Sequence, residues 1–147
     1  MSPTGGECAR AGILQPVLTS FAGSQIFGEV SGTGKPDVLA LHGWRRDHRD
    51  FAATLKSSAG ELDAIAVDLP GFGGTPAPEE VWGSPQYAEA LLPVLDHMQA
   101  GVVVIGHSLG GRVGVHLAAI APDRVAGARV VLGQDEDAHR AFTSSGG

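Results

Sequence analysis

The sequence predicts an α/β fold: one mostly parallel sheet with helices on both faces and an antiparallel hairpin at its start. Short continuous apolar runs, typical of strands buried on both sides, alternate with segments whose apolar residues recur at helical spacing. The length of 147 residues suits one ordinary domain. With 22 glycines and 9 prolines in a chain that is 43% hydrophobic, the composition is that of a globular protein.

The apolar pattern places each element in turn. Two weak apolar patches flank the Gly23-Ser24 turn signal and predict the hairpin, at 13–18 and 25–30. Buried strands are predicted at 38–41, 64–67, 102–105 and 129–132, and helices at 51–58, 86–98 and 109–120. We therefore expect a flexible N-terminus over 1–12, a partial domain over 13–132 and an irregular tail over 133–147.

The motif that carries chemistry is Gly-His-Ser-Leu-Gly at 106–110, directly after a predicted buried strand and directly before a predicted helix. A sharp turn there needs Gly106 and Gly110 to lack side chains so that strand and helix can approach closely. The turn would lift the Ser108 hydroxyl above the sheet edge and leave the Leu109 N–H at the helix N-terminus, where a developing oxyanion is stabilised. Ser108 is the predicted nucleophile.

A second oxyanion donor is expected from the loop after a neighbouring strand. His42-Gly43-Trp44 follows the predicted strand 38–41 at that position, and the Trp44 N–H is the candidate. Gly43 would let the backbone approach a substrate carbonyl, whereas His42 is expected to be structural.

Three segments together resemble the α/β-hydrolase fold superfamily, and within it the small esterase-like and carbon–carbon-bond hydrolases. They are Leu-His-Gly-Trp at 41–44, Asp-Leu-Pro-Gly-Phe-Gly at 68–73 and Gly-His-Ser-Leu-Gly-Gly at 106–111. The resemblance spans about 24–132. It implies a serine hydrolase that acts on ester-like bonds of small molecules, with Ser108 as the nucleophile.

The resemblance also implies a catalytic acid and then a histidine after the nucleophile. The chain ends soon after the predicted strand 129–132, which implies a truncated family member whose acid and base lie outside this chain or have been lost. Within the chain, Asp135 or Asp137 with His139 is the remaining candidate arrangement. Two alternatives stay open: an inactive remnant that binds a small molecule or a protein, and an acyltransferase on the same scaffold.

Other residues receive structural interpretations. Asp68 is expected to accept hydrogen bonds from amides of its own turn, and His107 to be packed beside the elbow. The charge-alternating run 45–50 is interpreted as a solvated loop and helix start without a site. The six histidines and single cysteine show no metal-ligand spacing, and the glycine-rich stretches fit no nucleotide fingerprint, so no metal or cofactor is expected.

The charge balance and hydropathy narrow the expected partners. A net charge of −6 without a basic run argues against nucleic acid as a partner. No apolar stretch approaches the roughly 20 residues of a membrane span, and no signal-peptide pattern opens the chain, so a cytoplasmic location is expected. An unpaired strand at 129–132 would be an exposed sheet edge and predicts self-association.

Overall fold

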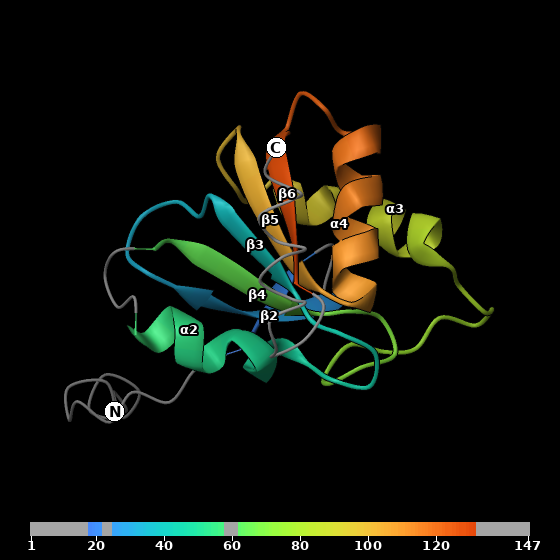
Figure 1. The fold of residues 1–147 in the computed structure, drawn as a ribbon. Helices are drawn as coiled ribbons and strands as arrows, with labels where there is room; N and C mark the ends of the chain where they lie inside the picture. The colour runs from blue at the N-terminus through green and yellow to red at the C-terminus, as the bar shows by residue number, and fades with distance from the viewer. Residues whose placement is uncertain (1–17, 22–24, 58–61, 132–147) are drawn as a thin grey trace.

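The computed structural model describes residues 18–21, 25–57 and 62–131. Six strands form one sheet in the order β1-β2-β4-β3-β5-β6 (Figure 1). β1 and β2 pair antiparallel, as do β2 and β4, and the pairs β3–β4, β3–β5 and β5–β6 are parallel. The strands are β1 (Leu18–Phe21), β2 (Ile26–Ser31), β3 (Val38–Leu41), β4 (Ala64–Asp68), β5 (Val102–His107) and β6 (Val125–Val131). The predicted α/β class, with its antiparallel start, is confirmed.

Helices cover both faces of the sheet. A 3-10 turn η1 (His48–Phe51) and helix α2 (Ala52–Ser57) lie on one face, and α3 (Ser84–Leu95) and α4 (Leu109–Ile120) lie on the other (Figure 1). Because successive strand residues point to opposite faces, alternate residues of one strand enter different cores. Leu39 and Leu41 belong to the core cluster with α3 and α4, whereas Ala40 packs with residues of η1 and α2.

The largest differences from the predicted boundaries occur at three places. The first strand of the hairpin lies at 18–21 rather than 13–18, and residues 13–17 lie outside the described residues. β6 begins at Val125, four residues before the predicted start. The prediction missed these residues because the alanines and glycine of 126–128 have low strand propensity. α3 covers 84–95 rather than 86–98, since a proline in its first turn starts it early and residues 96–98 form a turn.

The sheet topology brings the loop after β3 and the turn after β5 together at the carboxyl ends of these two strands. β3 lies between β4 and β5, so the chain leaves β3 toward one neighbour and later returns to pair on its other side. Leu41 at the end of β3 pairs with Gly106 near the end of β5. Ligand sites in open α/β sheets favour this position, outside the carboxyl ends of strands where the strand order reverses.

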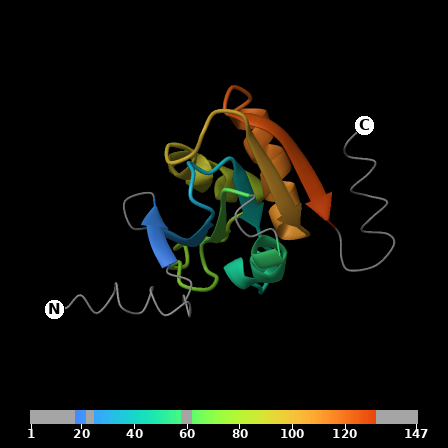
Figure 2. The same ribbon diagram turned by 90° about the vertical axis from the view of Figure 1, so that its left-hand side faces the viewer.

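The edges of the sheet lie at opposite sides of the molecule. Figure 2 shows β1 at one side and β6 at the other, which agrees with their places in the strand order. Among the described residues, no helix has the length and apolar character needed to cross a membrane.

Candidate functional site

The predicted strand–turn–helix at the motif is present. β5 ends at His107, α4 begins at Leu109, and Ser108 between them has φ 56° and ψ −111°. A positive φ is uncommon for a residue with a side chain and marks local strain. The Ser108 carbonyl accepts the amides of Gly111 (3.0 Å) and Arg112 (3.2 Å), so the helix starts directly at the serine.

The two motif glycines permit a close approach of three backbone segments. A Cβ built on Gly106 would lie 2.4 Å from the carbonyl atoms of Gly110. A Cβ built on Gly110 would lie 2.1 Å from the Leu41 carbonyl oxygen and 2.6 Å from that of His42. All these neighbours are backbone atoms, so a side chain at either glycine would force strand and helix apart. The first turn of α4 is therefore in direct contact with the end of β3.

The loop after β3 lies beside the elbow. A Cβ on Gly43 would lie 3.2 Å from the His107 carbonyl oxygen, which places the Gly43–Trp44 backbone next to the residue that precedes Ser108. The Trp44 side chain is 59% exposed, and its ring packs edge-on against Phe72 at a centroid distance of 5.3 Å. The structure thus brings together the elbow and the loop that the sequence singled out.

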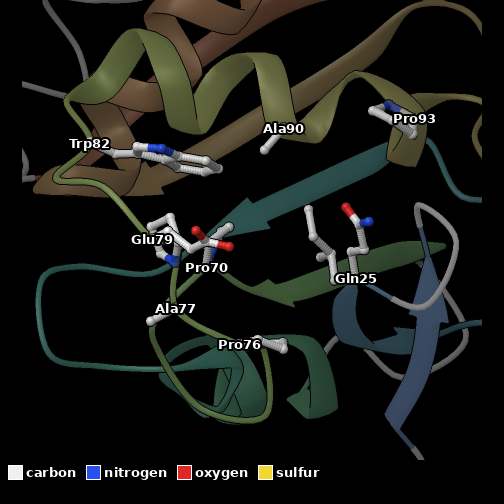
Figure 3. Close-up of a pocket in the computed structure, with 10 residues that line it drawn as sticks. Gln25, Pro70, Pro76, Ala77, Glu79, Trp82, Ala90 and Pro93 are labelled. Carbon is white, nitrogen blue, oxygen red and sulfur yellow. The ribbon is translucent and has the colours of Figure 1, made fainter.

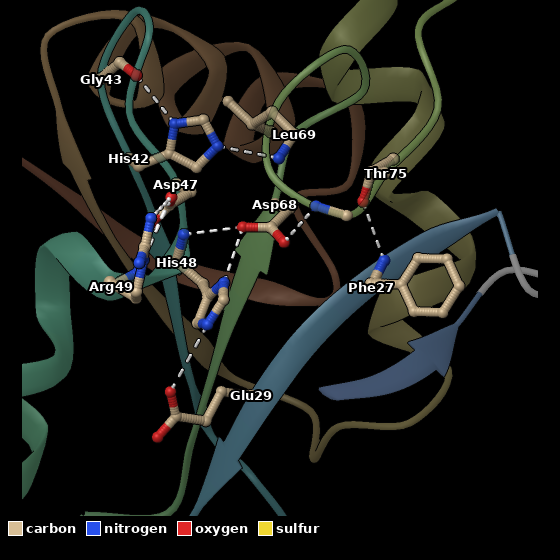
Figure 4. Close-up of polar contacts among 11 residues, drawn as sticks. Phe27, Glu29, His42, Gly43, Asp47, His48, Arg49, Asp68, Leu69 and Thr75 are labelled. Carbon is tan, nitrogen blue, oxygen red and sulfur yellow. Dashed lines mark hydrogen bonds and ion pairs between the residues drawn. The ribbon is translucent and has the colours of Figure 1, made fainter. Parts of the chain in front are cut away.

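His42 is a structural residue of this loop, as expected. Its side chain is fully buried. Nδ1 lies 2.7 Å from the Gly43 carbonyl oxygen, which only accepts, and Nε2 accepts the Leu69 amide at 2.9 Å, so the proton sits on Nδ1 (Figure 4). Burial lowers the pKa of His42 below its usual value, although its bond to Gly43 acts in the opposite direction. The imidazole is therefore neutral and ties the start of the loop to the end of β4.

Asp68 ties the other end of the same loop to β4. Its buried carboxylate accepts the His48 backbone amide at 2.7 Å and the His48 ring Nδ1–H at 2.8 Å through Oδ1. Oδ2 accepts the Gly74 amide at 2.9 Å, in line with the expected bonding to its own turn (Figure 4). The second ring nitrogen of His48, Nε2, lies 3.9 Å from Oε1 of Glu29. The segment 42–48 is thus held at both ends by consecutive residues, Asp68 and Leu69.

The interpretation of 45–50 as a solvated loop is wrong for two of its residues. Arg45, Arg46 and Arg49 are exposed, but His48 and Asp50 turn inward. His48 contacts Asp68, and Asp50 Oδ2 lies 3.7 Å from His107 Nδ1. Sequence reasoning missed both pairs because their members come from distant segments, and no spacing rule connects them.

Three side chains near the start of η1 and the end of β4 have ligand atoms within 4.8 Å of one another, those of Asp47, His48 and Asp68. Each is already engaged within the protein. Asp47 caps η1 through the Arg49 amide and pairs with the Arg49 guanidinium, which holds the pKa of Asp47 at about 2. Because His48 Nδ1 donates to Asp68, a metal ion would have to displace these bonds.

A cavity of about 540 Å³ lies between α3 and the loop that precedes it (Figure 3). Its volume is in the range of small-molecule sites. Figure 3 shows Trp82 and Ala90 on the α3 side, with Pro76 and Ala77 opposite. The described residues that line it do not include the elbow or the loop 42–48, so it is separate from the predicted site.

The candidate acid and base, Asp135, Asp137 and His139, lie outside the described residues, as do the predicted terminal segments 1–12 and 133–147.

Comparisons with curated proteins give relatives named for acyl chemistry. Esterase Rv0045c of Mycobacterium tuberculosis is 42% identical over 96 residues, which are 64% of this chain and 32% of the esterase. A pimeloyl-(acyl-carrier protein) methyl ester esterase of Chromobacterium violaceum is 38% identical over 68% of this chain and 37% of its own length. A dihydrolipoyllysine-residue acetyltransferase component of the acetoin cleaving system from Pseudomonas putida is 33% identical over 67% of this chain and 27% of its own. The chain thus spans about a third of the length of these relatives.

The fold comparison agrees. The crystal structure of esterase Rv0045c superposes with a TM-score of 0.69 at 28% identity, over 97% of this chain and 51% of that one. The family model described as the alpha/beta hydrolase family matches residues 38–145, which include the loop after β3 and the elbow. With this match added to the sheet order and the strand–serine–helix junction, the chain belongs to the alpha/beta hydrolase family.

Proposed function

We propose that this chain carries a serine hydrolase site for ester-like substrates, with Ser108 as the nucleophile. The observation that carries the proposal is the positive φ of Ser108 at the β5–α4 junction, where glycine packing fixes the turn. Strained backbone held by its surroundings is typical of functional positions. Relatives named as esterases support the same chemistry.

The proposed reaction is acyl transfer to the serine and then to water. Ser108 Oγ attacks the ester carbonyl carbon while a general base takes its proton, and the oxyanion receives hydrogen bonds from the Leu109 and Trp44 amides. The intermediate collapses to an acyl-serine as the alcohol leaves with that proton. Water attacks the acyl-serine by the same route and releases the acid. Asp135 or Asp137 with His139 is the candidate acid and base on this chain.

Labelling with a fluorophosphonate probe tests the proposal, because such probes react with activated serines. We expect labelling and p-nitrophenyl ester hydrolysis in the full chain, both abolished by Ser108→Ala and retained by the control Ser31→Ala at the end of β2. Loss of the signal in His139→Ala would identify the base. A folded sample without any Ser108-dependent signal would overturn the proposal and favour the non-catalytic binding module.

An acyltransferase is the second candidate, and the 33% identity to a protein named as an acetyltransferase component favours it. Product analysis with an added alcohol separates the two activities. A hydrolase gives mainly the free acid, whereas an acyltransferase gives mainly the new ester.

A further inference from the structure

Two buried polar atoms beside the elbow face each other without a hydrogen-bond partner among the described residues. They are Oδ2 of Asp50, in η1, and Nδ1 of His107, the last residue of β5, and they lie 3.7 Å apart. The Asp50 side chain is 10% exposed and the His107 side chain 26% exposed. Buried polar atoms in native proteins are almost always paired, so these two atoms require a chemical explanation.

We propose that Asp50 and His107 form a hydrogen-bonded carboxylate–imidazole pair that positions the Gly43–Trp44 backbone beside Ser108. The positioning role rests on the proposed function, in which the Trp44 amide receives the oxyanion. The pair itself does not depend on that function. Asp50 and His107 are positioning residues, because the proposal gives neither of them a contact with substrate.

The partners of Asp50 determine where the proton lies. Arg46 Nε donates to Oδ1, so Oδ2 is the oxygen left to accept a hydrogen bond. An ionised carboxylate only accepts, so the hydrogen must come from His107 Nδ1. The two atoms lie 3.7 Å apart, so the proposed bond requires them to approach to about 3.2 Å or less. The His107 ring is then fixed as the Nδ1–H tautomer, because the hydrogen bond at one ring nitrogen sets the protonation of the other.

The ring of His107 is in turn packed against Gly43. A Cβ built on Gly43 would lie 2.6 Å from His107 Nδ1 and 3.1 Å from Cε1, so the ring occupies the space that any other residue would fill. His42 Nδ1 also donates to the Gly43 carbonyl oxygen. Gly43 thus contacts two imidazoles, and in the proposal Asp50 fixes one of them. A shift of the His107 ring is therefore expected to shift the Gly43–Trp44 backbone.

Nitrogen NMR of the full chain labelled with ¹⁵N-histidine tests the pair without any need for activity. At about pH 8, where imidazoles are neutral, the wild-type protein is expected to show His107 as the Nδ1–H tautomer. In Asp50→Asn, the Arg46 guanidinium can only donate, so the amide oxygen of the new side chain faces Arg46. The amide NH₂ group then faces His107. His107 Nδ1 must then accept, and the tautomer switches to Nε2–H.

The same samples report on the loop. Backbone amide shifts of Gly43 and Trp44 are expected to move in Asp50→Asn and to stay in place in the control Asp96→Asn, whose carboxylate pairs with Arg124 at an exposed site. Asp50→Ala is the second variant, since it removes the acceptor without adding a donor. The proposal would be overturned if His107 of the wild type were the Nε2–H tautomer. It would also be overturned if neither Asp50 substitution changed the His107 tautomer or the Gly43 and Trp44 amide shifts.

Fluorophosphonate labelling separates this proposal from the proposed function. If Ser108 labels in the wild type, Asp50→Asn is expected to slow labelling about tenfold, since a donor of the oxyanion hole is displaced rather than deleted. If Ser108 is never labelled, the proposed function fails. The His107 tautomer and the Gly43 and Trp44 amide shifts then still test whether the Asp50–His107 hydrogen bond forms. An unchanged labelling rate together with a switched tautomer would refute the positioning role.

Discussion

Single polar residues, rather than the apolar core, hold the loops of the candidate site in place. His42 and Asp68 are fully buried, and each forms hydrogen bonds to backbone amides or carbonyls of a neighbouring loop. Thr75 extends this network, because its hydroxyl accepts the Phe27 amide at 3.0 Å and fastens the loop after β4 to β2 (Figure 4). A buried polar group without its partner costs more free energy than the bond contributes, so these residues tolerate few substitutions.

Burial of neutral His42 predicts a pH dependence of stability. The folded-state pKa of His42 lies below the unfolded value of 6.5, so the unfolded chain binds more protons between the two values. The free energy of unfolding therefore rises with pH through this window, by at most about 1.4 kcal/mol per pH unit. Urea unfolding from about pH 5 to 7 should show this slope reduced in His42→Asn. An equal slope in both proteins would contradict the prediction.

Removal of the Asp68 carboxylate is expected to destabilise the fold strongly. Asp68→Ala leaves the His48 amide and ring and the Gly74 amide without their acceptor inside the protein. We expect a loss of about 3–5 kcal/mol in the free energy of unfolding, measured by urea denaturation. The exposed control Asp96→Ala, which loses only its pair with Arg124, should cost about 1 kcal/mol or less. Similar losses in the two variants would show that the Asp68 network does not stabilise the fold.

At the scale of elements, the elbow is a junction of two strand ends and a helix start. β3 and β5 end side by side, and the first turn of α4 lies against both. The positive φ of Ser108 is maintained because the strand before it and the helix after it are each anchored in the sheet and core.

A methyl group at Gly110 should test how closely these elements pack. The Cβ of Gly110→Ala would lie 2.1 Å from the Leu41 carbonyl oxygen, so α4 or β3 must move, and we expect destabilisation of about 3 kcal/mol or more. Gly127→Ala in β6 is the matched control, because a Cβ there meets nothing within 4 Å and should change stability little. Thermal and urea unfolding compare the two. Equal stabilities would mean that the junction is looser than the structure indicates.

At the scale of the whole molecule, the sheet ends in β6, which pairs with β5 and with no other strand among the described residues. An unpaired strand edge is a template for pairing with another chain. The described sheet has two such edges, β1 and β6, and the outer rim of β6 is the edge through which we expect self-association.

Light scattering over a range of concentrations tests this prediction. We expect the 147-residue chain to form dimers, and Ala126→Lys, which places a charge at an exposed position of β6, to shift the equilibrium to monomer. Ala53→Lys on the exposed side of α2 should leave the dimer intact. A monodisperse wild-type monomer at every concentration would rule out self-association through this edge.

Much of this molecule follows from local sequence patterns. The strands predicted at 38–41, 64–67 and 102–105 and the helix predicted at 109–120 are present, because apolar periodicity reports burial over a few residues. β4 and β5 extend beyond the predicted ends, to Asp68 and His107. The elbow was predictable for the same reason, since its glycines, its serine and its flanking strand and helix are contiguous. The start of β6 was missed where small residues interrupt the apolar run.

The amino-acid sequence by itself determined the α/β class, the strand–serine–helix turn and the adjacent glycine loop, because each depends on residues that are neighbours in the chain. Only the tertiary structure decided the strand order and the pairs of His48 with Asp68 and of Asp50 with His107. These pairs depend on which strand ends meet at the sheet edge. That choice is made by packing of the whole sheet, which no local pattern of charge or hydropathy encodes.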